Sequence, residues 1–423
     1  MADSRRRTII PLLPAQRLPS PAGTGVRFSS PPPLALYIHV PWCVQKCPYC
    51  DFNSHALRLG DFHSHGSNER GTAAIPESDY LAALIGDLES ALPLVWGRRV
   101  DSIFFGGGTP SLLSGEAVDE LLAALRSRLP LLPSAEITLE ANPGTVESGK
   151  FAAFRAAGVN RLSLGIQSFN AKHLKALGRI HDDHDARRAI GMAASHFDNF
   201  NLDLMYGLPE QTLAEALADL DTALSYAPAH LSCYQLTIEA NTAFAARPPV
   251  LPDADACADM QDGIEAKLAA AGYRHYETSA FAQAGHQCQH NLNYWQFGDY
   301  LGIGAGAHSK LTLHDRVLRQ MRWKRPEQYL AQAAAGQPVQ EEFAVDAADL
   351  PFEFMLNALR LIDGFDASLF ESRTARSLFS IENQLRQAED DGLIERHRQH
   401  IAPSDRGRRF LNQLLQRFLV ERA

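Results

Sequence analysis

The sequence contains no uninterrupted run of about 18 apolar residues, so no membrane-spanning helix is expected. It contains only six cysteines in 423 residues, too few for a scaffold held together by disulfides. Positive charge is not in excess: 40 basic and 49 acidic residues give a formal net charge of −9, which argues against general nucleic-acid binding. With 45% apolar and 21% charged residues, the chain is typical of a globular protein of two or three domains.

We interpret residues 1–33 as a disordered leader rich in proline and serine. Three arginines at positions 5 to 7 are weakly similar to a twin-arginine export signal. Pro11 and Pro14 interrupt the apolar stretch behind them, so no continuous hydrophobic region of a signal peptide is present, and export is the less favoured interpretation. A second polar stretch, residues 55–77, is expected to be a solvated loop, although it contains His55, His63 and His65.

From residue 34 onward, short apolar runs alternate with amphipathic segments of helical spacing. The runs that are typical of strands are Leu34–Val40, Asp101–Phe105, Glu136–Ala141, Arg161–Gln167, Asn201–Tyr206 and His230–Leu236. The segments that are typical of helices are Tyr80–Leu92, Ala117–Leu129, Ser148–Ala157, Asp183–Ala194 and Leu213–Ser225. This alternation predicts an α/β fold with a parallel sheet covered by helices, either open and doubly wound or a full or partial TIM-like barrel. Both folds bind ligands at the carboxyl ends of the strands.

The alternation ends near residue 240, and the C-terminal domain beyond it is expected to be mostly helical. Expected elements are helices at Ala256–Ala271, Pro351–Ile362, Ile381–Asp390 and Arg406–Leu419, a glycine-rich loop at Leu301–Ala307 and short strands within Leu393–Ile401. The last helix–strand–helix pattern is typical of a small winged-helix-like domain. We therefore divide the chain into the leader 1–33, a barrel 34–240, a barrel extension 241–345 and a helical C-terminal domain 346–423.

Three cysteines, Cys43, Cys47 and Cys50, lie within eight residues directly after the first predicted strand. Such clustering indicates a metal centre in a reducing compartment. A four-iron cluster prefers a ligand on every iron, so three local thiolates leave one iron open to a small molecule. The spacing alone also leaves open a structural zinc ion, with His39 or His55 as its fourth ligand.

Polar residues and glycines follow the ends of the other predicted strands. Gly107 and Gly108 lack a Cβ and allow close approach of the backbone to a ligand, and the adjacent Thr109 adds a hydroxyl group. Arg179 offers a planar fork that suits a carboxylate. Two other acceptors, Glu140 and Gln167, lie at the ends of predicted strands, and a third, Asp203, lies within the fifth predicted strand. Because the ends of parallel strands meet at one edge, these residues predict a single ligand site.

The C-x3-C-x2-C spacing of the cysteines resembles the signature of the radical S-adenosylmethionine (SAM) superfamily. Longer segments, Leu36–Cys43, Phe105–Ser111, Ser163–Phe169 and Asp203–Pro209, are similar to its coproporphyrinogen dehydrogenase-type branch. That branch contains the oxygen-independent coproporphyrinogen III oxidases and the HemW-like haem chaperones, and the resemblance covers residues 34–420. It implies a partial (β/α)6 TIM-like barrel in which the three cysteines hold a [4Fe–4S] cluster. SAM would chelate the remaining iron, and one electron would cleave it to a 5′-deoxyadenosyl radical.

The resemblance also implies residues of a SAM site. Tyr49 would lie against the adenine, and the phenol of Tyr37 would supply a hydrogen bond beside the cluster. The other residues expected at the SAM site are Gly107, Gly108, Thr109, Glu140, Gln167, Arg179 and Asp203. The resemblance assigns none of them as a catalytic residue.

Two features distinguish the sub-families of this branch. The oxidases carry a fourth cysteine two residues after the third, where this chain has Phe52. His290–Trp295 matches the H-N-x-x-Y-W motif of the haem chaperones, in which His290 can be an axial ligand and Tyr294 and Trp295 can pack on a flat macrocycle. We therefore expect a haem chaperone that delivers haem to apoproteins. The alternatives are a coproporphyrinogen III oxidase and a zinc-stabilised binding module.

The same resemblance implies the partners of the protein. They are haem, the apoproteins that accept it, an electron donor and a second copy of the chain in a homodimer. SAM and a low-potential reductant are cytosolic supplies, so a cytoplasmic location is expected. SAM cleavage is compatible with this interpretation, whereas coproporphyrinogen oxidase activity is not expected because of Phe52.

Overall fold

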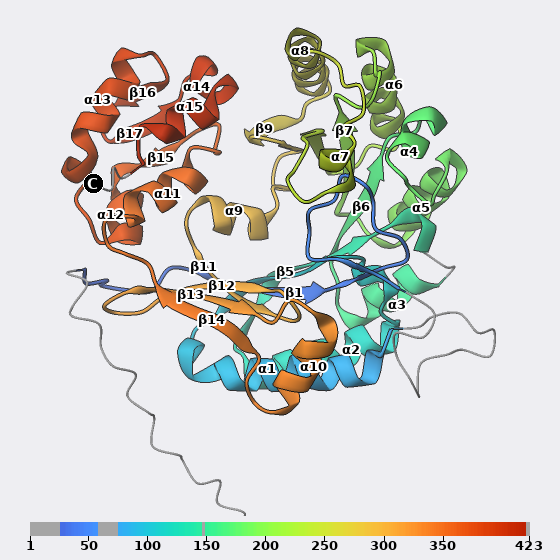
Figure 1. Cartoon of the computed structure of the whole chain (residues 1–423), viewed down its shortest axis with the longest axis horizontal. Helices are drawn as coiled ribbons and strands as arrows, with labels where there is room; N and C mark the ends of the chain where they lie inside the picture. The colour runs from blue at the N-terminus through green and yellow to red at the C-terminus, as the bar shows by residue number, and fades with distance from the viewer. Residues whose placement is uncertain (1–25, 58–74, 146–148, 420–423) are drawn as a thin grey trace, which may run out of the picture.

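The computed structural model describes residues 26–57, 75–145 and 149–419, and a mixed sheet of 12 strands organises most of them (Figure 1). Seven neighbouring strands run parallel, and antiparallel strands extend the sheet at both ends. In sheet order, the parallel strands are β11 (Asp299–Ile303), β1 (Leu34–Val40), β4 (Val100–Gly107), β5 (Leu131–Ala141), β6 (Arg161–Gln167), β7 (Phe200–Tyr206) and β8 (His230–Gln235). The two ends of the sheet do not pair with each other, so the prediction of an α/β fold with an incompletely closed barrel is confirmed.

The helices that connect the parallel strands cover the outer face of the sheet, along its lower and right-hand sides in Figure 1. They are α1 (Glu77–Val95), α2 (Gly115–Arg128), α3 (Lys150–Ala157), α4 (Ala171–Ala176), α5 (Asp183–His196) and α6 (Leu213–Leu224), with short 3-10 turns at Pro110–Leu112 and Pro143–Thr145. Side chains cap several of their N-termini: Ser114, Asn170, Asp182 and Thr212 each accept a hydrogen bond from a first-turn N–H group. The predicted helices therefore begin within a few residues of the expected positions.

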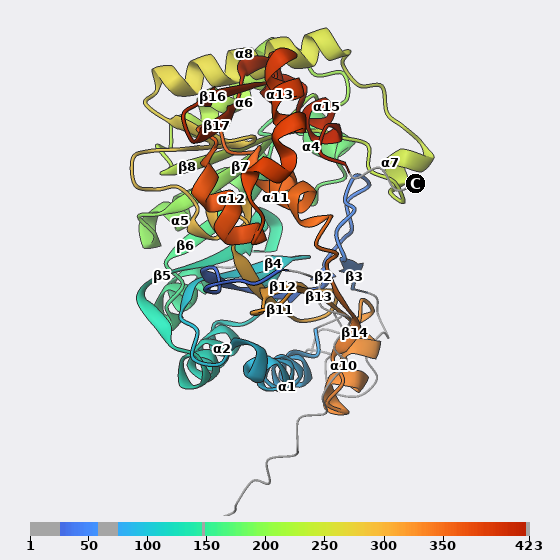
Figure 2. The ribbon, with the colours of Figure 1, turned by 90° about the vertical axis from the view of Figure 1, so that its left-hand side faces the viewer.

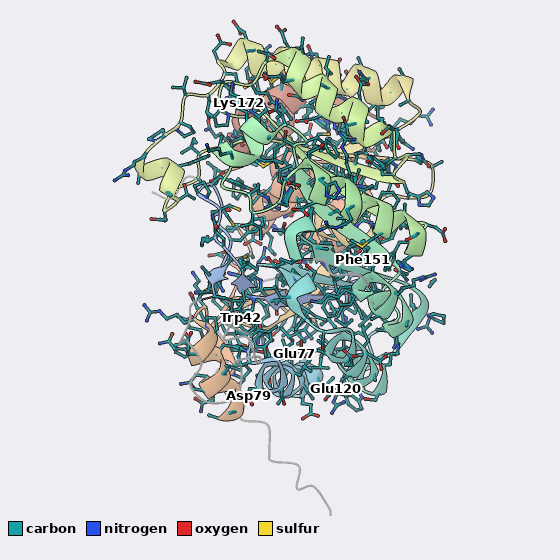
Figure 3. All side chains as sticks on the ribbon, turned by 90° about the vertical axis from the view of Figure 1, so that its right-hand side faces the viewer. Trp42, Glu77, Asp79, Glu120, Phe151 and Lys172 are labelled. Atoms are coloured by element: carbon teal, nitrogen blue, oxygen red, sulfur yellow. The ribbon has the colours of Figure 1, made fainter. Side chains whose placement is uncertain are left out.

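The apolar faces of these helices and the strands form one continuous core. Phe151 of α3 and Trp42 after β1 are each only 2% exposed, whereas Asp79, Glu120 and Lys172 project outward from their helices (Figure 3). The spacing of Val118, Leu121, Leu122 and Leu125 buries one side of α2 completely. This binary pattern explains why the sequence places the six strand–helix units correctly.

After β8 the chain departs from the alternating pattern. The intervening elements are α7 (Ala243–Ala246), α8 (Ala254–Ala270), β9 (Arg274–Glu277), β10 (Ala280–Ala282) and α9 (Gln289–Trp295). They are followed by β12 (His308–Thr312), β13 (Val317–Arg322), α10 (Pro326–Ala334) and β14 (Val339–Ala344). The prediction of a loop at Leu301–Ala307 is wrong for its first three residues. Leu301, Gly302 and Ile303 belong to β11, which pairs in parallel with β1.

The C-terminal elements build a second, smaller hydrophobic core, which Figure 1 shows at the upper left and Figure 2 from the front. Phe354, Phe365 and Phe370 meet edge to face at its centre. The elements are α11 (Leu350–Ala358), β15 (Phe365–Asp366), α12 (Ala367–Thr374), a 3-10 turn at Leu378–Ile381, α13 (Glu382–Asp390), β16 (Ile394–His397), β17 (His400–Pro403), α14 (Asp405–Arg409) and α15 (Leu411–Gln416). The predicted order of helix, short strands and helix is observed, but the last helix breaks at Phe410.

Residues 26–33, the described part of the predicted leader, pack against the rest of the structure. Val26 is buried against Val317, Val345 and Leu350, and the N–H group of Phe28 donates to the carbonyl of His314 at 2.9 Å. The prediction of disorder up to residue 33 is therefore wrong for residues 26–33, and residues 1–25 lie outside the described part of the chain. His63 and His65 also lie outside it. Within the described ranges, no helix is long and apolar enough to cross a membrane.

Candidate functional site

A cavity of about 750 Å³ opens at the carboxyl ends of the parallel strands. Its volume falls within the usual range for small-molecule and cofactor sites. The cavity is lined by these sequence-predicted residues: Cys43, Cys47, Tyr49, Cys50, Gly107, Gly108, Thr109, Glu140, Gln167, Arg179 and Asp203. The structure thus brings together the strand-end residues that the sequence predicts to share one site.

The three cysteines project from a short, tightly curved loop between β2 (Trp42–Cys43) and β3 (His55–Ala56). Trp42 anchors the start of this loop, since its buried ring lies edge-on to Tyr80 with centroids 4.7 Å apart. The N–H group of Cys50 donates to the carbonyl of Cys47 at 3.2 Å, which closes a turn between two of the thiols. All three thiols are free and half-buried, so they face the cavity without pairing with one another.

Polar side chains from neighbouring strands approach the sulfur atoms. The hydroxyl of Thr109 donates to Cys43 Sγ at 3.4 Å, and the Arg179 guanidinium donates to Cys47 Sγ at 3.6 Å. Burial raises the pKa of the Cys43 thiol, and the hydrogen bond from Thr109 opposes that rise. Hydrogen bonds to sulfur stabilise thiolate ligands and tune iron–sulfur centres, so the donor set fits a cluster held by three cysteines.

The two histidines considered as a fourth zinc ligand do not line this cavity. Both ring nitrogens of His39 are engaged: one is hydrogen-bonded to the Tyr37 hydroxyl at 3.0 Å and the other to the Asn53 carbonyl at 2.9 Å. Burial lowers the pKa of His39 to about 4. His55 is hydrogen-bonded to the side-chain oxygen of Asn53 at 3.3 Å. These contacts disfavour the zinc alternative, because no histidine of the described ranges lines the cavity that contains the thiols.

The two glycines after β4 are required by packing between loops. A Cβ at Gly108 would lie 2.5 Å from the carbonyl oxygen of Trp42, and a Cβ at Gly107 would lie 2.6 Å from the His39 ring. Gly107 also has a φ of 114°, a conformation that side chains disfavour. Both residues therefore hold the cavity wall against the cysteine loop, and their expected contact with a ligand remains a prediction.

We expect Gly108→Ala to displace the cysteine loop. The added methyl group collides with the backbone of Trp42, and overpacking of this kind costs about 1–3 kcal/mol of stability. Urea unfolding and the iron content after anaerobic reconstitution measure the two effects. Gly191→Ala is the matched control, because Gly191 lies in α5 with nothing within 4 Å of its Cβ position. Equal stability and iron content in both variants would contradict the assignment.

Two carboxyl groups form the floor of the cavity. Burial, with a smaller contribution from the nearby Asp203, raises the pKa of Glu140 to about 8, so near neutral pH this group is mainly protonated and can donate a hydrogen bond. Burial also raises the pKa of Asp203, while hydrogen bonds from Asn201 at 2.8 Å and Ser163 at 2.9 Å oppose the shift. The floor therefore offers both donor and acceptor groups to a polar ligand.

Gln167 and Arg179 complete the cavity wall, and Arg179 lies beside the cysteine loop. Gln167 has a φ of 68°, which is uncommon for a residue with a side chain and indicates local backbone strain at this point of the cavity. Arg179 donates to the carbonyl of Gly165 at 2.8 Å as well as to Cys47. Tyr49 packs near Phe244, with ring centroids 6.4 Å apart. These contacts fix the orientation of the wall before any ligand binds.

Four residues expected at ligand sites are not in the cavity wall. Tyr37 lies behind it, hydrogen-bonded to His39. His290 is 2% exposed, stacks on Phe104 at 4.9 Å and is hydrogen-bonded through Nδ1 to the Ser102 hydroxyl at 3.1 Å. Tyr294 and Trp295 lie further along the same short helix, α9. Burial, followed by the charge of Arg161, lowers the pKa of His290 to about 3, so the imidazole is neutral.

The cavity also contains residues outside the expected SAM site. Asn142 directly follows a predicted strand, as the strand-end rule expects, whereas Ser163 lies in the first half of β6, inside a motif that carried the family resemblance. Tyr234 belongs to β8, where it follows four consecutive buried residues, and its residue type alone gives no chemical signal. Arg360 comes from the segment after α11, far away in sequence, and only the three-dimensional structure brings it here.

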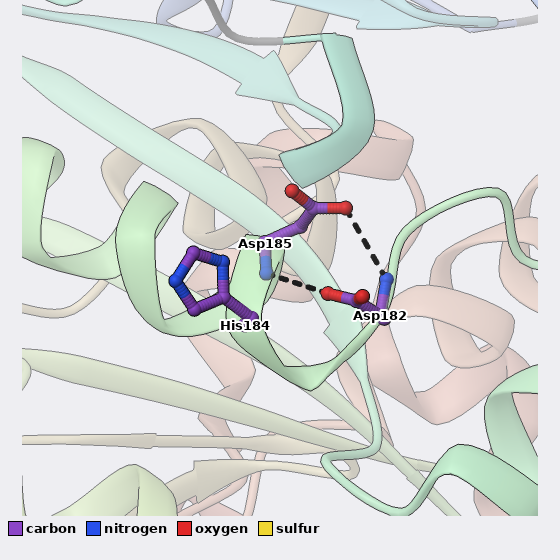
Figure 4. A group of neighbouring side chains, drawn as sticks. All are labelled: Asp182, His184 and Asp185. Carbon is purple, nitrogen blue, oxygen red and sulfur yellow. Dashed lines mark hydrogen bonds between the residues drawn. The ribbon is translucent and has the colours of Figure 1, made fainter.

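A second group of titratable side chains, Asp182, His184 and Asp185, lies at the start of α5 (Figure 4). The two aspartates form a capping box, because each accepts a hydrogen bond from the N–H group of the other. These groups are largely solvent-exposed, and the capping interaction accounts for their proximity. We assign them a structural role.

The chain is similar to proteins of known family. Residues 37–223 match the model of the Radical SAM superfamily, and residues 345–410 match that of the HemN C-terminal domain. An Escherichia coli (strain K12) protein named "Heme chaperone HemW" is 49% identical over 392 residues, which cover 92% of this chain and 99% of that protein. A protein of the same name from Haemophilus influenzae is 47% identical, with the same coverage of both chains. The solved structure of coproporphyrinogen III oxidase (HemN) from E. coli, described as a radical SAM enzyme, matches with a TM-score of 0.74 and 25% identity over 92% of this chain and 90% of that chain.

Proposed function

This chain belongs to the HemW family of radical SAM proteins, and on that premise we propose that it is a haem chaperone, which binds haem as cargo and delivers it to apoproteins. Radical SAM membership implies a [4Fe–4S] cluster and SAM. The observation that carries the proposal is the placement of three free thiols in one cavity, with the His290–Trp295 helix packed between that barrel and the C-terminal core.

We assign the cluster to Cys43, Cys47 and Cys50, and SAM to the cavity wall beside them. A cluster with bound SAM supplies one-electron chemistry. The chain itself donates hydrogen bonds to two of the sulfurs from Thr109 and Arg179. Glu140, Gln167 and Asp203 present polar groups to the same space, where they suit the amino, carboxylate and ribose groups of SAM. Tyr37 supports this site indirectly, through the hydrogen bond that fixes His39 beneath the loop.

We place the haem against α9, with His290 as its axial ligand. The Nδ1 atom of this imidazole is held by Ser102, while its Nε2 atom is buried without a hydrogen-bond partner among the described residues. A neutral imidazole with one nitrogen oriented and the other free suits metal ligation. Because the side chain is 2% exposed, ligation of iron requires α9 to move outward. The rings of Tyr294 and Trp295 then flank the macrocycle.

The proposal predicts a specific loss in the variant His290→Ala. Haem titration followed by visible absorption is expected to show an affinity lower by at least about tenfold and a changed Soret band, because the axial ligand is absent. Ser102→Ala is expected to give a smaller loss, since it removes only the partner that orients the ring. His400→Ala is the control, because His400 lies in the C-terminal core region away from α9. Equal haem affinity and an unchanged spectrum for His290→Ala would refute the placement.

We do not propose a coproporphyrinogen oxidase, despite the structural similarity to HemN. Phe52 occupies the position where the oxidases have a fourth cysteine, and its ring is 61% exposed at the edge of the cavity. It offers no sulfur to a ligand there. For the remaining partners, we propose an electron donor, a second copy of the chain and a cytoplasmic location, where SAM and reductant are supplied.

A further inference from the structure

Two guanidinium groups line the cavity, and they differ in how they are used. Arg179 donates to Cys47 and to the carbonyl of Gly165. Arg360 also lines the cavity, but its guanidinium donates no hydrogen bond and has no carboxylate oxygen within 4.0 Å in the described part of the chain. An arginine with unused donors, placed in a ligand cavity, is suited to a carboxylate or phosphate of that ligand.

We propose that Arg360 binds a carboxylate of the ligand, and that this carboxylate is a propionate of the haem cargo. The inference rests on the proposed function and deepens it, because it assigns a residue of the C-terminal core to recognition of the cargo. Arg360 belongs to the segment that matches the HemN C-terminal domain model, whereas the cysteines belong to the barrel.

The backbone of Arg360 is fixed where the C-terminal core meets the barrel. Its carbonyl accepts a hydrogen bond from the N–H group of Thr278 at 3.0 Å. Two residues later, the N–H group of Ile362 donates to the carbonyl of Tyr276 at 3.1 Å, and Leu361 forms a bridge with Glu277. In Figure 1, α9 lies between the C-terminal helices and β9. The side chain of Arg360 therefore starts from a rigid position beside α9.

The guanidinium lies over the ring of Trp295, with its Cζ atom 4.5 Å from the ring centroid. This contact stacks a cation on the last residue of the H-N-x-x-Y-W motif. Three buried polar atoms at this junction have no hydrogen-bond partner among the described residues: Arg360 Nε, Trp295 Nε1 and Glu277 Oε2. Buried polar atoms are rarely left unpaired, so this cluster points to a polar ligand.

Glu277 does not neutralise Arg360. Burial raises the pKa of Glu277 to about 7, with the charge of Arg360 opposing the rise, so this carboxyl is partly protonated near neutral pH. A ligand carboxylate that approaches Arg360 therefore meets a cation whose charge is not already paired.

The same chemistry has two sources, the carboxylate of SAM in the cavity and the propionates of haem against α9. The position of Arg360 favours haem: Arg179 lies beside the cysteine loop, where SAM is expected, whereas Arg360 lies on Trp295 of α9, where the macrocycle is expected. A flat apolar ring with carboxylates on one edge fits an aromatic surface with a cation beside it.

The test compares haem with haem dimethyl ester, in which both propionates are esterified. The wild-type protein is expected to bind haem about tenfold to one-hundredfold more tightly than the ester, as a charge-assisted pair requires. Arg360→Gln is expected to bind both forms as weakly as the wild type binds the ester, and Arg360→Lys to recover part of the difference. Arg386→Gln is the matched control, because this arginine lies in α13 with a side chain 65% exposed. Thermal unfolding verifies that each variant is folded.

Each outcome decides between explanations. Wild-type affinity for haem in Arg360→Gln, or equal binding of haem and its ester by the wild type, would overturn the inference and leave the chaperone proposal intact. Weaker SAM binding with unchanged haem binding would assign Arg360 to SAM and also overturn it. If neither the wild type nor Arg386→Gln binds haem, the proposed function itself fails, and this inference fails with it.

Discussion

Cys47→Ala is expected to yield a folded, colourless protein that retains little iron or sulfide after anaerobic reconstitution. The loop between β2 and β3 supplies three thiols to one cavity, and two remaining sulfurs cannot hold a four-iron cluster. Metal affinity depends strongly on every ligand, so iron content should fall by about an order of magnitude or more. Arg179 then loses the sulfur that accepts its hydrogen bond, but Cys47 is only half-buried, so the fold should survive.

The control for this result is Cys257→Ala. Cys257 lies in α8, buried and outside the cavity wall, and its removal should leave iron and sulfide at the wild-type level. Iron and sulfide assays together with visible absorption measure both variants. A Cys47→Ala protein with the wild-type iron content would show that the cluster is elsewhere. A colourless wild type that holds zinc would show that there is no cluster at all.

Arg322→Met is expected to lower the free energy of unfolding by about 3–5 kcal/mol. Arg322 and Asp87 are both completely buried, and the guanidinium Nε lies 3.1 Å from Asp87 Oδ1. The other oxygen of Asp87 accepts hydrogen bonds from Tyr329 at 2.9 Å and from the N–H group of Gly304 at 3.1 Å. Without the arginine, a negative charge remains in the core between α1, α10 and the β11–β12 connection, where water cannot solvate it.

Chemical unfolding of the variants measures this effect. The double variant Asp87→Asn/Arg322→Met should recover part of the lost stability, because it removes the charge as well as its partner. Arg409→Met is the matched control, since its ion pair with Asp262 is about half-exposed and should contribute at most ~1 kcal/mol. A loss in Arg322→Met no larger than in this control would mean that the buried pair does not stabilise the fold.

Periodicity was sufficient for most of the barrel. The strands β1 and β6 have the bounds that the sequence predicts for them, Leu34–Val40 and Arg161–Gln167. Buried parallel strands are largely apolar segments, and the amphipathic helices between them mark where each strand begins and ends. β11 was missed for a physical reason. Its Gly302 resembles a loop residue, but a Cβ there would lie 2.1 Å from the His308 carbonyl, so the glycine permits the next strand to approach.

The site residues could be predicted where a side chain able to bind a ligand lies at the end of a predicted strand. Cys43, Glu140 and Gln167 follow this rule, and all of them line the cavity. Tertiary contacts between distant segments carry no such signal. Nothing in the local sequence around Arg360 indicates that it reaches the cavity, and the motif containing His290 does not reveal that the imidazole is the buried side chain of α9. A residue that reaches the site only because the C-terminal core packs against the barrel cannot be identified without the three-dimensional structure.

The pairing of β1 with β11 has a consequence for how the protein is made. Leu34 pairs with Asp299, so the strand that precedes the cysteine loop obtains one of its two neighbours only after more than half of the chain has been synthesised. At ribosomal speeds of about 5–20 residues per second, that interval is on the order of tens of seconds. Until then the backbone of β1 has an open edge, and the nascent thiols beside it lack their finished surroundings. Iron–sulfur maturation of this protein therefore belongs after translation of the barrel, on a released or nearly complete polypeptide.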